Sequence, residues 1–351
     1  MNFQLNLKKG DKKMKKLLTL VMVSAVMIAT SSQAATCTFT GGAGPSDPSW
    51  FTAANWDNAI VPSATSNIWS DMSVGYGPTI DAAGAVGNEM TVGLYGHDGD
   101  VIVGASGTLT LGTYIMLGLT ATDFGTVLNN GTINVTSTYL HAGTALLVNN
   151  GTLSGTALIL GQAPGGDNTL TNNGQITMTG STYMNHVTNT LVNNGTLVTD
   201  GLLNGHVASS VSRIVNTGTI TVDGWFYTSV ASTAPAILDM NGGVMVNGYM
   251  EMTGNAASTI NLNEGIITNT TLGLDGNATN KTIVVDNGVM YSGGDQTAGL
   301  DYLISIGLIT GKGEKIPFSS YDGSYTKLYA IPEPAIIGAL SLLGIALLRR
   351  K

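Results

Sequence analysis

The two residues best placed for acid-base chemistry in this chain are Asp200 and Asp223. A glycosidase needs two carboxyl groups about 5 to 10 Å apart. Each aspartate stands five residues after a glycine that recurs along the chain, Gly195 or Gly218, so the two should stack on adjacent turns of a repeat. Each is also followed by a glycine, and Asp-Gly commonly begins a turn. We expect turns here, and a carbohydrate-active enzyme, either a glycosidase or a polysaccharide lyase, remains the alternative.

Metal binding and lyase chemistry have weaker support. His186 and His206 fall at similar positions of neighbouring repeats, with His141 two repeats earlier, but no Cys, Asp or Glu stands close to them as a further ligand. A lyase usually needs a cation beside its acidic groups, and the repeats offer only Arg213 and Lys281, about three turns apart. We therefore expect no catalytic residue, no metal site and no cofactor.

A repeat of about 23 residues organises the elements that carry these side chains. Glycines recur at intervals of 20 to 25 residues, and an apolar residue stands two positions after each. The glycines are Gly107, Gly131, Gly151, Gly174, Gly195, Gly218, Gly243, Gly265 and Gly288. The apolar residues are Leu109, Ile133, Leu153, Ile176, Leu197, Ile220, Met245, Ile267 and Met290. The regularity predicts stacked, equivalent turns.

A polar column accompanies the apolar one. Two positions before the glycine stand Asn129, Asn149, Asn172, Asn193, Asn216, Asn241 and Asn263, and then Asp286. Asn and Gly both tolerate the left-handed backbone angles of a sharp corner, and stacked amides can hydrogen-bond from turn to turn. Residues after the corner alternate between apolar and polar types, as in a half-buried strand. We predict an all-β protein, a parallel β-solenoid of about nine coils with N- and C-terminal caps. A β-sandwich is the rival, since such corners also make hairpins.

The strand after each corner points a row of hydroxyl side chains outward. It includes Thr108, Thr110, Thr132, Thr152, Ser154, Thr177, Thr196, Thr219 and Thr221, with Asn134 and Gln175 between them. Regular hydroxyl rows on a flat face resemble those of ice-binding proteins, which gives a further alternative function. Threonine is also a favoured strand residue, and the rows lapse at Val244, Val246, Ile266 and Val289.

The segment before the repeats has its own pattern. Residues 50–57, with Trp50 and Trp56 around an Ala-Ala-Asn stretch, precede Val61-Pro62. This segment resembles the opening of the passenger β-helices of autotransporter-like proteins, and we expect it to cap the first coil. Residues 300–309 and the tyrosine-rich piece through Tyr329 should close the other end.

The N-terminus has the pattern of an export signal. Lysines precede an apolar stretch from Leu17 to Ala29, and small residues lead to a cleavage site between Ala34 and Ala35. Met14 fits as the natural start of this signal. The lone Cys37 cannot form an intramolecular disulfide, and no lipid-attachment box surrounds it.

The C-terminus combines three features. Pro332-Glu333-Pro334 precedes an uncharged apolar run from Ala335 to Leu348, and Arg349, Arg350 and Lys351 end the chain. This arrangement resembles the PEP-CTERM sorting signal of Gram-negative bacteria. The resemblance implies a short transmembrane helix with a basic tail, processing by an exosortase, and release to the cell surface or matrix of a biofilm.

The charge of the body excludes one class of partner. Residues 35 to 331 contain 20 acidic and five basic residues, a net charge of about −15. Nucleic-acid binding needs clustered Lys and Arg, so it is excluded.

We predict an exported structural or adhesive protein of the cell surface or extracellular matrix. Its partners would be signal peptidase, an exosortase-like enzyme, the inner membrane before processing, and an extracellular polysaccharide. The expected parts are a signal peptide (1–34), an N-terminal cap (35–88), the solenoid (89–293), a C-terminal cap and spacer (294–331) and the sorting signal (332–351).

Overall fold

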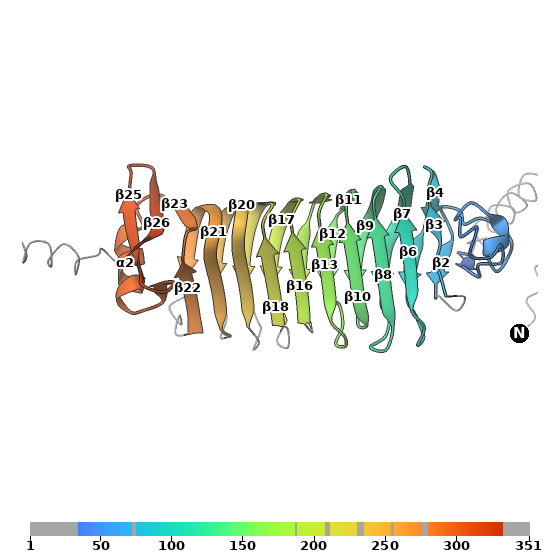
Figure 1. The fold of residues 1–351 in the computed structure, drawn as a ribbon, viewed down its shortest axis with the longest axis horizontal. Helices are drawn as coiled ribbons and strands as arrows, with labels where there is room; N and C mark the ends of the chain where they lie inside the picture. The colour runs from blue at the N-terminus through green and yellow to red at the C-terminus, as the bar shows by residue number, and fades with distance from the viewer. Residues whose placement is uncertain are drawn as a thin grey trace, which may run out of the picture. The chain divides into compact units, whose positions relative to one another are not determined.

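The chain folds into a parallel β-solenoid of about ten turns (Figure 1). The computed structural model describes residues 34–71, 75–186, 188–207, 211–229, 235–253, 256–274 and 280–332. Apart from the helices η1 (Ala53–Asn55) and α2 (Thr297–Ser305), the described regular structure is all β. The prediction of an all-β solenoid is confirmed. The structure has about ten turns where the sequence predicts nine, because a turn without an Asn-Gly corner comes first and stacks Ala85 on Leu109.

Each turn contributes strands to three faces. The asparagine face leads into the repeating corner. It consists of β3 (Thr79–Ile80), β6 (Gly99–Val103), β8 (Phe124–Asn129), β10 (Thr144–Asn149), β13 (Asn168–Asn172), β16 (Thr188–Asn193), β18 (Val211–Asn216), the first parts of β20 (Ala236–Met252) and β21 (Ser258–Leu274), β22 (Lys281–Val285) and β24 (Ile309–Gly311).

The threonine face follows the corner. It consists of β4 (Ala85–Gly87), the first parts of β7 (Thr108–Leu117) and β9 (Thr132–Leu140), β11 (Thr152–Gly155), β14 (Gln175–Met178), the first parts of β17 (Thr196–Asn204) and β19 (Thr219–Thr228), the middle of β20 and of β21, and β23 (Val289–Gly293).

The aromatic face completes each turn. It consists of β1 (Thr36–Thr38), β2 (Asn67–Ser70), β5 (Glu89–Val92), the second parts of β7 and β9, β12 (Ala157–Leu160), β15 (Ser181–Met184), and the last parts of β17, β19, β20 and β21.

The predicted apolar column fills the bore. Its nine members, from Leu109 to Met290, are all 0 or 1% exposed. They also follow one another in parallel register, so each side chain lies directly over its equivalent in the previous turn, as Ile220 does over Leu197. Residues between them point outward, which is the period-two alternation of a strand buried on one side.

The asparagines form two ladders at the corner. In the inner ladder Asn129, Asn149, Asn172, Asn193 and Asn216 are fully buried, and each of the first four side-chain amides donates to the amide oxygen of the next at 2.6 to 2.8 Å. The same nitrogens also reach backbone carbonyls of the next turn, as Asn172 does with Thr196 at 2.9 Å. An outer, exposed ladder runs beside it through Asn130, Asn150, Asn173, Asn194 and Thr217. The prediction of amide hydrogen bonds between turns is confirmed.

The last three members of the predicted asparagine column lie elsewhere. Asn216 stacks on Met240, which places Asn241 beside Thr217 in the outer ladder. Asn263 donates to Asn241 at 2.8 Å in an exposed hydrogen bond and so continues that ladder. The reason is one extra residue in the later corners: Met240 stands three positions before its corner glycine Gly243, whereas Asn216 stands two positions before Gly218. Counting back two positions from the glycine therefore reaches the outer ladder instead of the bore.

The corner glycines are needed mostly for close approach between turns. Among the nine, only Gly243 and Gly265 have positive φ, so the left-handed angle expected at every corner is wrong for the other seven. A Cβ on Gly218 would lie 2.1 Å from the carbonyl oxygen of Gly195, and one on Gly195 equally close to Gly174. A methyl group does not fit at that distance, so the stacking of the turns selects glycine.

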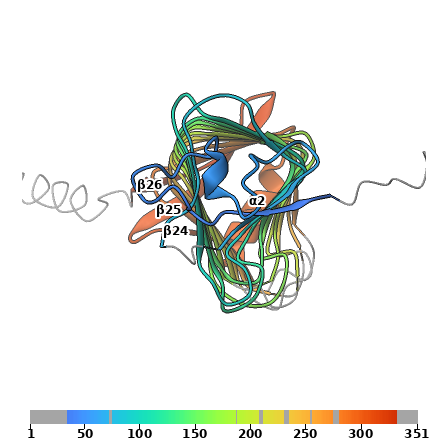
Figure 2. The ribbon, with the colours of Figure 1, turned by 90° about the vertical axis from the view of Figure 1, so that its right-hand side faces the viewer.

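The N-terminal segment that contains η1, drawn in blue, lies across the N-terminal end of the stack (Figure 2), and an aromatic cluster packs there. Phe39, Trp50 and Trp56 are at most 2% exposed, and the two indole rings meet edge to face at 4.9 Å. Trp56 donates from its indole nitrogen to the carbonyl of Trp50 at 2.8 Å. Asn55, at the end of η1, donates to the carbonyls of Asp47 and Ser49. The tryptophan segment thus covers the first turns, as its sequence predicts.

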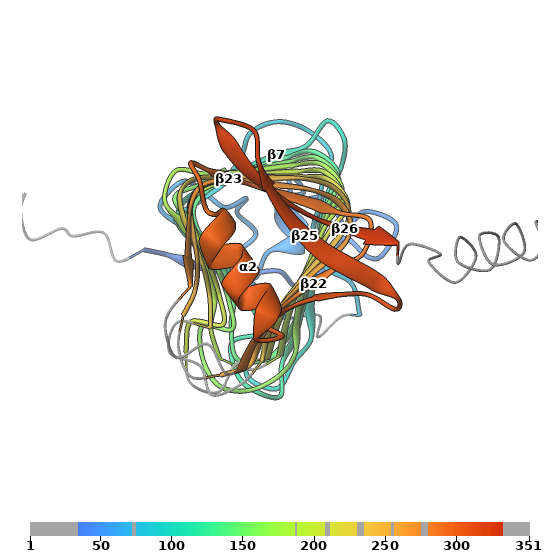
Figure 3. The same ribbon diagram turned by 90° about the vertical axis from the view of Figure 1, so that its left-hand side faces the viewer.

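Helix α2 lies across the C-terminal end of the stack (Figure 3). Its Leu300 and Leu303 are buried against the last turns. The hairpin of β25 (Lys315–Tyr321) and β26 (Tyr325–Pro332) packs beside it, and β26 pairs antiparallel with β23. Both ends of the parallel stack are therefore covered.

The predicted targeting segments lie almost entirely outside the described residues. The apolar stretch of the export signal falls before residue 34, and Glu333 to Lys351, with the predicted transmembrane helix, follow the last described residue. Within the described ranges no helix combines the length and the apolar character that crossing a bilayer requires.

Cys37 is buried, with Ile68 as its register partner.

Candidate functional site

Asp200 and Asp223 lie at the corner between the threonine and aromatic faces. Both are exposed. They do not stack directly, because the register shifts by one residue and Gly224 takes the place above Asp200. Beneath this corner the buried Thr199 hydroxyl donates to the carbonyls of Gly180 and Gly201 at 2.9 and 3.0 Å. The two carboxylates thus lie on adjacent turns of an open surface, and the corner itself is organised by a threonine.

His141 and His206 have separate surroundings, and His206 contacts Asn185, the residue before His186. His141 Nδ1 lies 2.9 Å from the carbonyl oxygen of Leu119, and His206 Nδ1 lies 3.0 Å from Oδ1 of Asn185. The ring of His206 also packs on Tyr183, and its partial burial lowers the pKa of the imidazole. Within the described ranges, no group of three or more His, Cys, Asp or Glu side chains is arranged to hold a metal ion.

Three cations, Arg213, Lys312 and Lys315, form ion pairs within the protein. Arg213 meets the buried Asp239 at 2.6 Å, and Asn261 donates to the other oxygen of the same carboxylate. Lys312 and Lys315, from the C-terminal cap, both contact Asp286 at the end of the outer ladder. The hydrogen bond from Lys315 lowers the pKa of Asp286. Arg213 in β18 and Lys281 in β22 lie three turns apart, as predicted.

The threonine face carries the predicted rows in register. Thr108, Thr132 and Thr152 stack on one another, and so do Thr110, Asn134 and Ser154. A shallow groove runs along the second row at its border with the corner threonines Thr136, Thr156 and Thr179. Several of its groups are engaged within the protein: Ser154 donates to Asn134 at 2.6 Å, and Thr136 to the carbonyl of Gly112 at 2.9 Å. The row is therefore chemically mixed, and ice binding gains no specific support from it.

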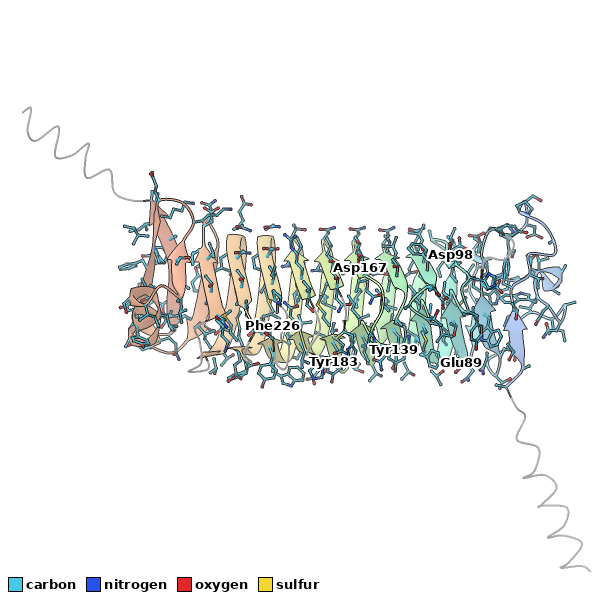
Figure 4. The ribbon with its side chains drawn as sticks, turned by 90° about the horizontal axis from the view of Figure 1, so that it is seen from below. Glu89, Asp98, Tyr139, Asp167, Tyr183 and Phe226 are labelled. Carbon is cyan, nitrogen blue, oxygen red and sulfur yellow. The ribbon has the colours of Figure 1, made fainter. Side chains whose placement is uncertain are left out.

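The aromatic face holds a set of side chains that the sequence analysis does not single out. Its first outward row is Trp69, Thr91, Met116, Tyr139, Ile159, Tyr183, Leu203, Tyr227 and Glu251, one residue per turn. Its second row includes Glu89, Tyr114, Ser137, Ala157, Ser181, Gly201, Trp225 and Tyr249. The tyrosines and tryptophans of both rows are partly exposed. In Figure 4, Glu89, Tyr139 and Tyr183 follow one another along one side of the stack.

A signal for this face is present in the sequence. Tyr139, Tyr183 and Tyr227 are each 44 residues apart, which equals two turns of the repeat. The repeat length varies between 20 and 25 residues, so a search for single-turn spacing passes over them. The structure aligns them because the extra residues of the longer turns lie at the corners, so the strands keep their register.

Comparison of the chain with family models, with curated proteins and with solved structures finds no match.

Proposed function

We propose that this protein is an exported, non-enzymatic β-solenoid that serves as a structural and adhesive component of the cell surface or extracellular matrix. The observation that carries the proposal is the stack itself, about ten turns whose strands pair in parallel on each face, with both ends covered. An in-register solenoid is a stiff scaffold whose long faces are available for contact. Capped ends remove the open strand edges through which such stacks aggregate.

The resemblance to the PEP-CTERM signal supplies the proposed route. Signal peptidase would cut between Ala34 and Ala35, and residues 335–348 would anchor the chain in the inner membrane until an exosortase-like enzyme acts. Ala35 and Pro332 are both exposed, so the solenoid leaves the chain accessible where each cleavage is proposed. The body has a net charge of about −15, which favours a well-solvated protein outside the cell and disfavours binding to nucleic acid.

Intact mass spectrometry of the native surface protein tests the route. We expect a mass that lacks the signal peptide and Ala335 to Lys351. Glu333→Ala should leave an uncut form in the membrane fraction, since Glu333 is the only charged group of the motif. Asp322→Ala, a nearby acidic residue outside the motif, is the control and should be processed normally. A mature protein that keeps its C-terminal tail would overturn the sorting proposal.

The enzyme alternative is tested separately. The purified protein would be incubated with a panel of bacterial and algal polysaccharides, with ultraviolet detection of unsaturated lyase products and a reducing-sugar assay for hydrolysis. We expect no product. Product formation that disappears in Asp200→Asn or Asp223→Asn would establish the carbohydrate-active enzyme instead.

A further inference from the structure

We propose that the aromatic face binds an extended, uncharged β-1,4-linked glycan lying along the stack. This inference rests on the proposed adhesive function and names its ligand class and the surface that recognises it. The argument uses three properties of the face: the spacing of its tyrosines, the fixed placement of its rings and its charge.

The spacing comes from the register of the turns. Tyr139 stacks on Ile159 and then Tyr183, and Tyr183 stacks on Leu203 and then Tyr227. Neighbouring strands are about 4.8 Å apart, so tyrosines on alternate turns repeat every ~9.6 Å. An extended β-1,4-linked glycan presents the same ring face at every second sugar, with a repeat of comparable length. One row of tyrosines can therefore meet equivalent sugars along a single chain.

The rings are held in place before any ligand binds. Trp225 and Tyr227 stack with centroids 5.1 Å apart and planes 22° apart, and Tyr227 meets Tyr249 at 5.9 Å. Gly201 leaves the space that the indole fills, because a Cβ there would lie 2.5 Å from a carbon of Trp225. Tyr114 packs on Tyr139 at 5.8 Å. Aromatic side chains fixed in this way lose little conformational freedom on binding, which favours recognition.

The charge of the face selects among glycans. Its outward rows contain Glu89 and Glu251 and, over the described residues, no Lys or Arg. Tyr249 donates its hydroxyl to Glu251 at 2.8 Å. Burial, together with a hydrogen bond to Glu89, raises the pKa of Tyr114 to about 12, so this phenol stays protonated and neutral. Carboxylates accept hydrogen bonds from sugar hydroxyls but repel uronic acids and sulfated sugars. The face therefore suits a neutral glycan.

The test is affinity electrophoresis and calorimetry of the full-length protein with four probes. Hydroxyethyl cellulose and cellohexaose are neutral and β-1,4-linked, dextran is neutral and α-linked, and alginate is anionic. We expect binding to the two β-1,4-linked probes only. Truncation of a hot-spot aromatic residue weakens an interface by a factor of about 30, so Tyr183→Ala, in the middle of the row, should weaken cellohexaose binding by about tenfold or more.

Two variants separate recognition from folding. Tyr183→Phe keeps the ring and should bind nearly as well as the unaltered protein. Tyr302→Ala removes a tyrosine that is 62% exposed on α2 of the C-terminal cap, away from this face, and should leave binding unchanged. Thermal unfolding of each variant confirms that the fold persists.

The binding experiments can fail without affecting the proposed export and processing. Absence of binding to both β-1,4-linked probes, equal binding to alginate, or an unchanged affinity in Tyr183→Ala would each overturn the glycan inference. None of these results alters where the protein is exported or how its tail is processed, which the mass measurement on the native protein decides independently.

Discussion

At one position of the bore, the central turns carry a polar side chain and the C-terminal turns carry an apolar one. In the central turns, with corners between Asn129 and Gly218, the place is taken by the buried asparagine ladder. In the C-terminal turns, residues 236 to 293, Met240, Leu262 and Val285 occupy it. Three features change together there: the corner gains a residue, two of its glycines adopt positive φ, and apolar residues enter the outward rows.

The difference shows what a buried amide requires. In the central turns each inner-ladder amide has a carbonyl oxygen of the next turn within 2.8 Å, or the thioether of Met240 at the ladder's end, so burial is compensated. In the C-terminal turns Asn247 and Asn269 lie in another column of the bore. Neither polar atom of the Asn247 amide has a hydrogen-bond partner among the described residues. A buried asparagine thus stabilises the fold where the neighbouring turn offers its amide a hydrogen-bond partner, and destabilises the fold where it does not.

The largest expected effect tests the apolar column that both regions share. Ile220→Asp would place an unpaired charge in the bore, and we expect a loss of about 3 to 5 kcal/mol in the free energy of unfolding. Thr219→Asp, one residue away and exposed, should change stability by less than about 0.5 kcal/mol. Chemical denaturation of both variants measures the difference. Equal losses would contradict the inward and outward assignment.

The corner glycines give the next largest effect and distinguish the regions. A Cβ on Gly218 would lie 2.1 Å from the Gly195 carbonyl oxygen, whereas one on Gly288 would meet Leu262 at 3.0 Å. We expect Gly218→Ala to lower stability by about 2 to 3 kcal/mol and Gly288→Ala by about 1 kcal/mol. Thermal unfolding compares them. A greater loss from Gly288→Ala would show that turn-to-turn approach is not what selects glycine in the central corners.

The inner ladder can be broken at one rung. Asn193→Ala removes the acceptor of Asn172 and the donor to Asn216, and we expect a loss of about 2 kcal/mol because buried partners are left unpaired. Asn194→Ala interrupts the exposed outer ladder, where water replaces the lost bonds, and should cost less than about 0.5 kcal/mol. Equilibrium unfolding in urea checks both. Similar values would mean that the inner ladder contributes no more than a surface contact.

A stabilising substitution is expected in the C-terminal turns. Asn247 stacks on Val222 of the preceding turn, so Asn247→Val adds an apolar contact there and removes an amide that has no hydrogen-bond partner among the described residues. We expect a gain of about 1 kcal/mol, seen as a higher melting temperature. Val222→Asn is the reverse change and should destabilise. A lower melting temperature for Asn247→Val would reveal a role for that amide.

The smallest expected effect depends on pH. Hydrogen bonding from Lys315 and Lys312 lowers the pKa of Asp286 below its usual value of 3.8. The folded state therefore binds this proton less readily than the unfolded chain, so the stabilisation is present above about pH 4 and is lost as the pH falls further. Asp286→Asn should flatten this part of the stability curve, measured between pH 2 and 6, whereas Asp223→Asn, at an exposed corner of a central turn, should retain it. An unchanged acid dependence in Asp286→Asn would rule out the ion pair as its source.

Much of this fold follows from the sequence itself. The recurring glycine and the apolar residue two positions later predict the stack, because every turn of a solenoid repeats the same local environment. Trp50 and Trp56 likewise mark the N-terminal cap, since their segment precedes the repeats and lacks the repeating pattern.

Only the tertiary structure decides which residues of different turns meet. Asn241 obeys the sequence pattern of Asn216 but lies in the outer ladder, because a single added corner residue shifts it out of the bore. Tyr139, Tyr183 and Tyr227 form one row only because the corners absorb unequal turn lengths and restore the register between strands. The sequence therefore determines the repeating turn and its inward side chains, which depend on local alternation. The outer faces, where a ligand could bind, depend on how successive turns align, and that alignment is set by backbone hydrogen bonds between turns.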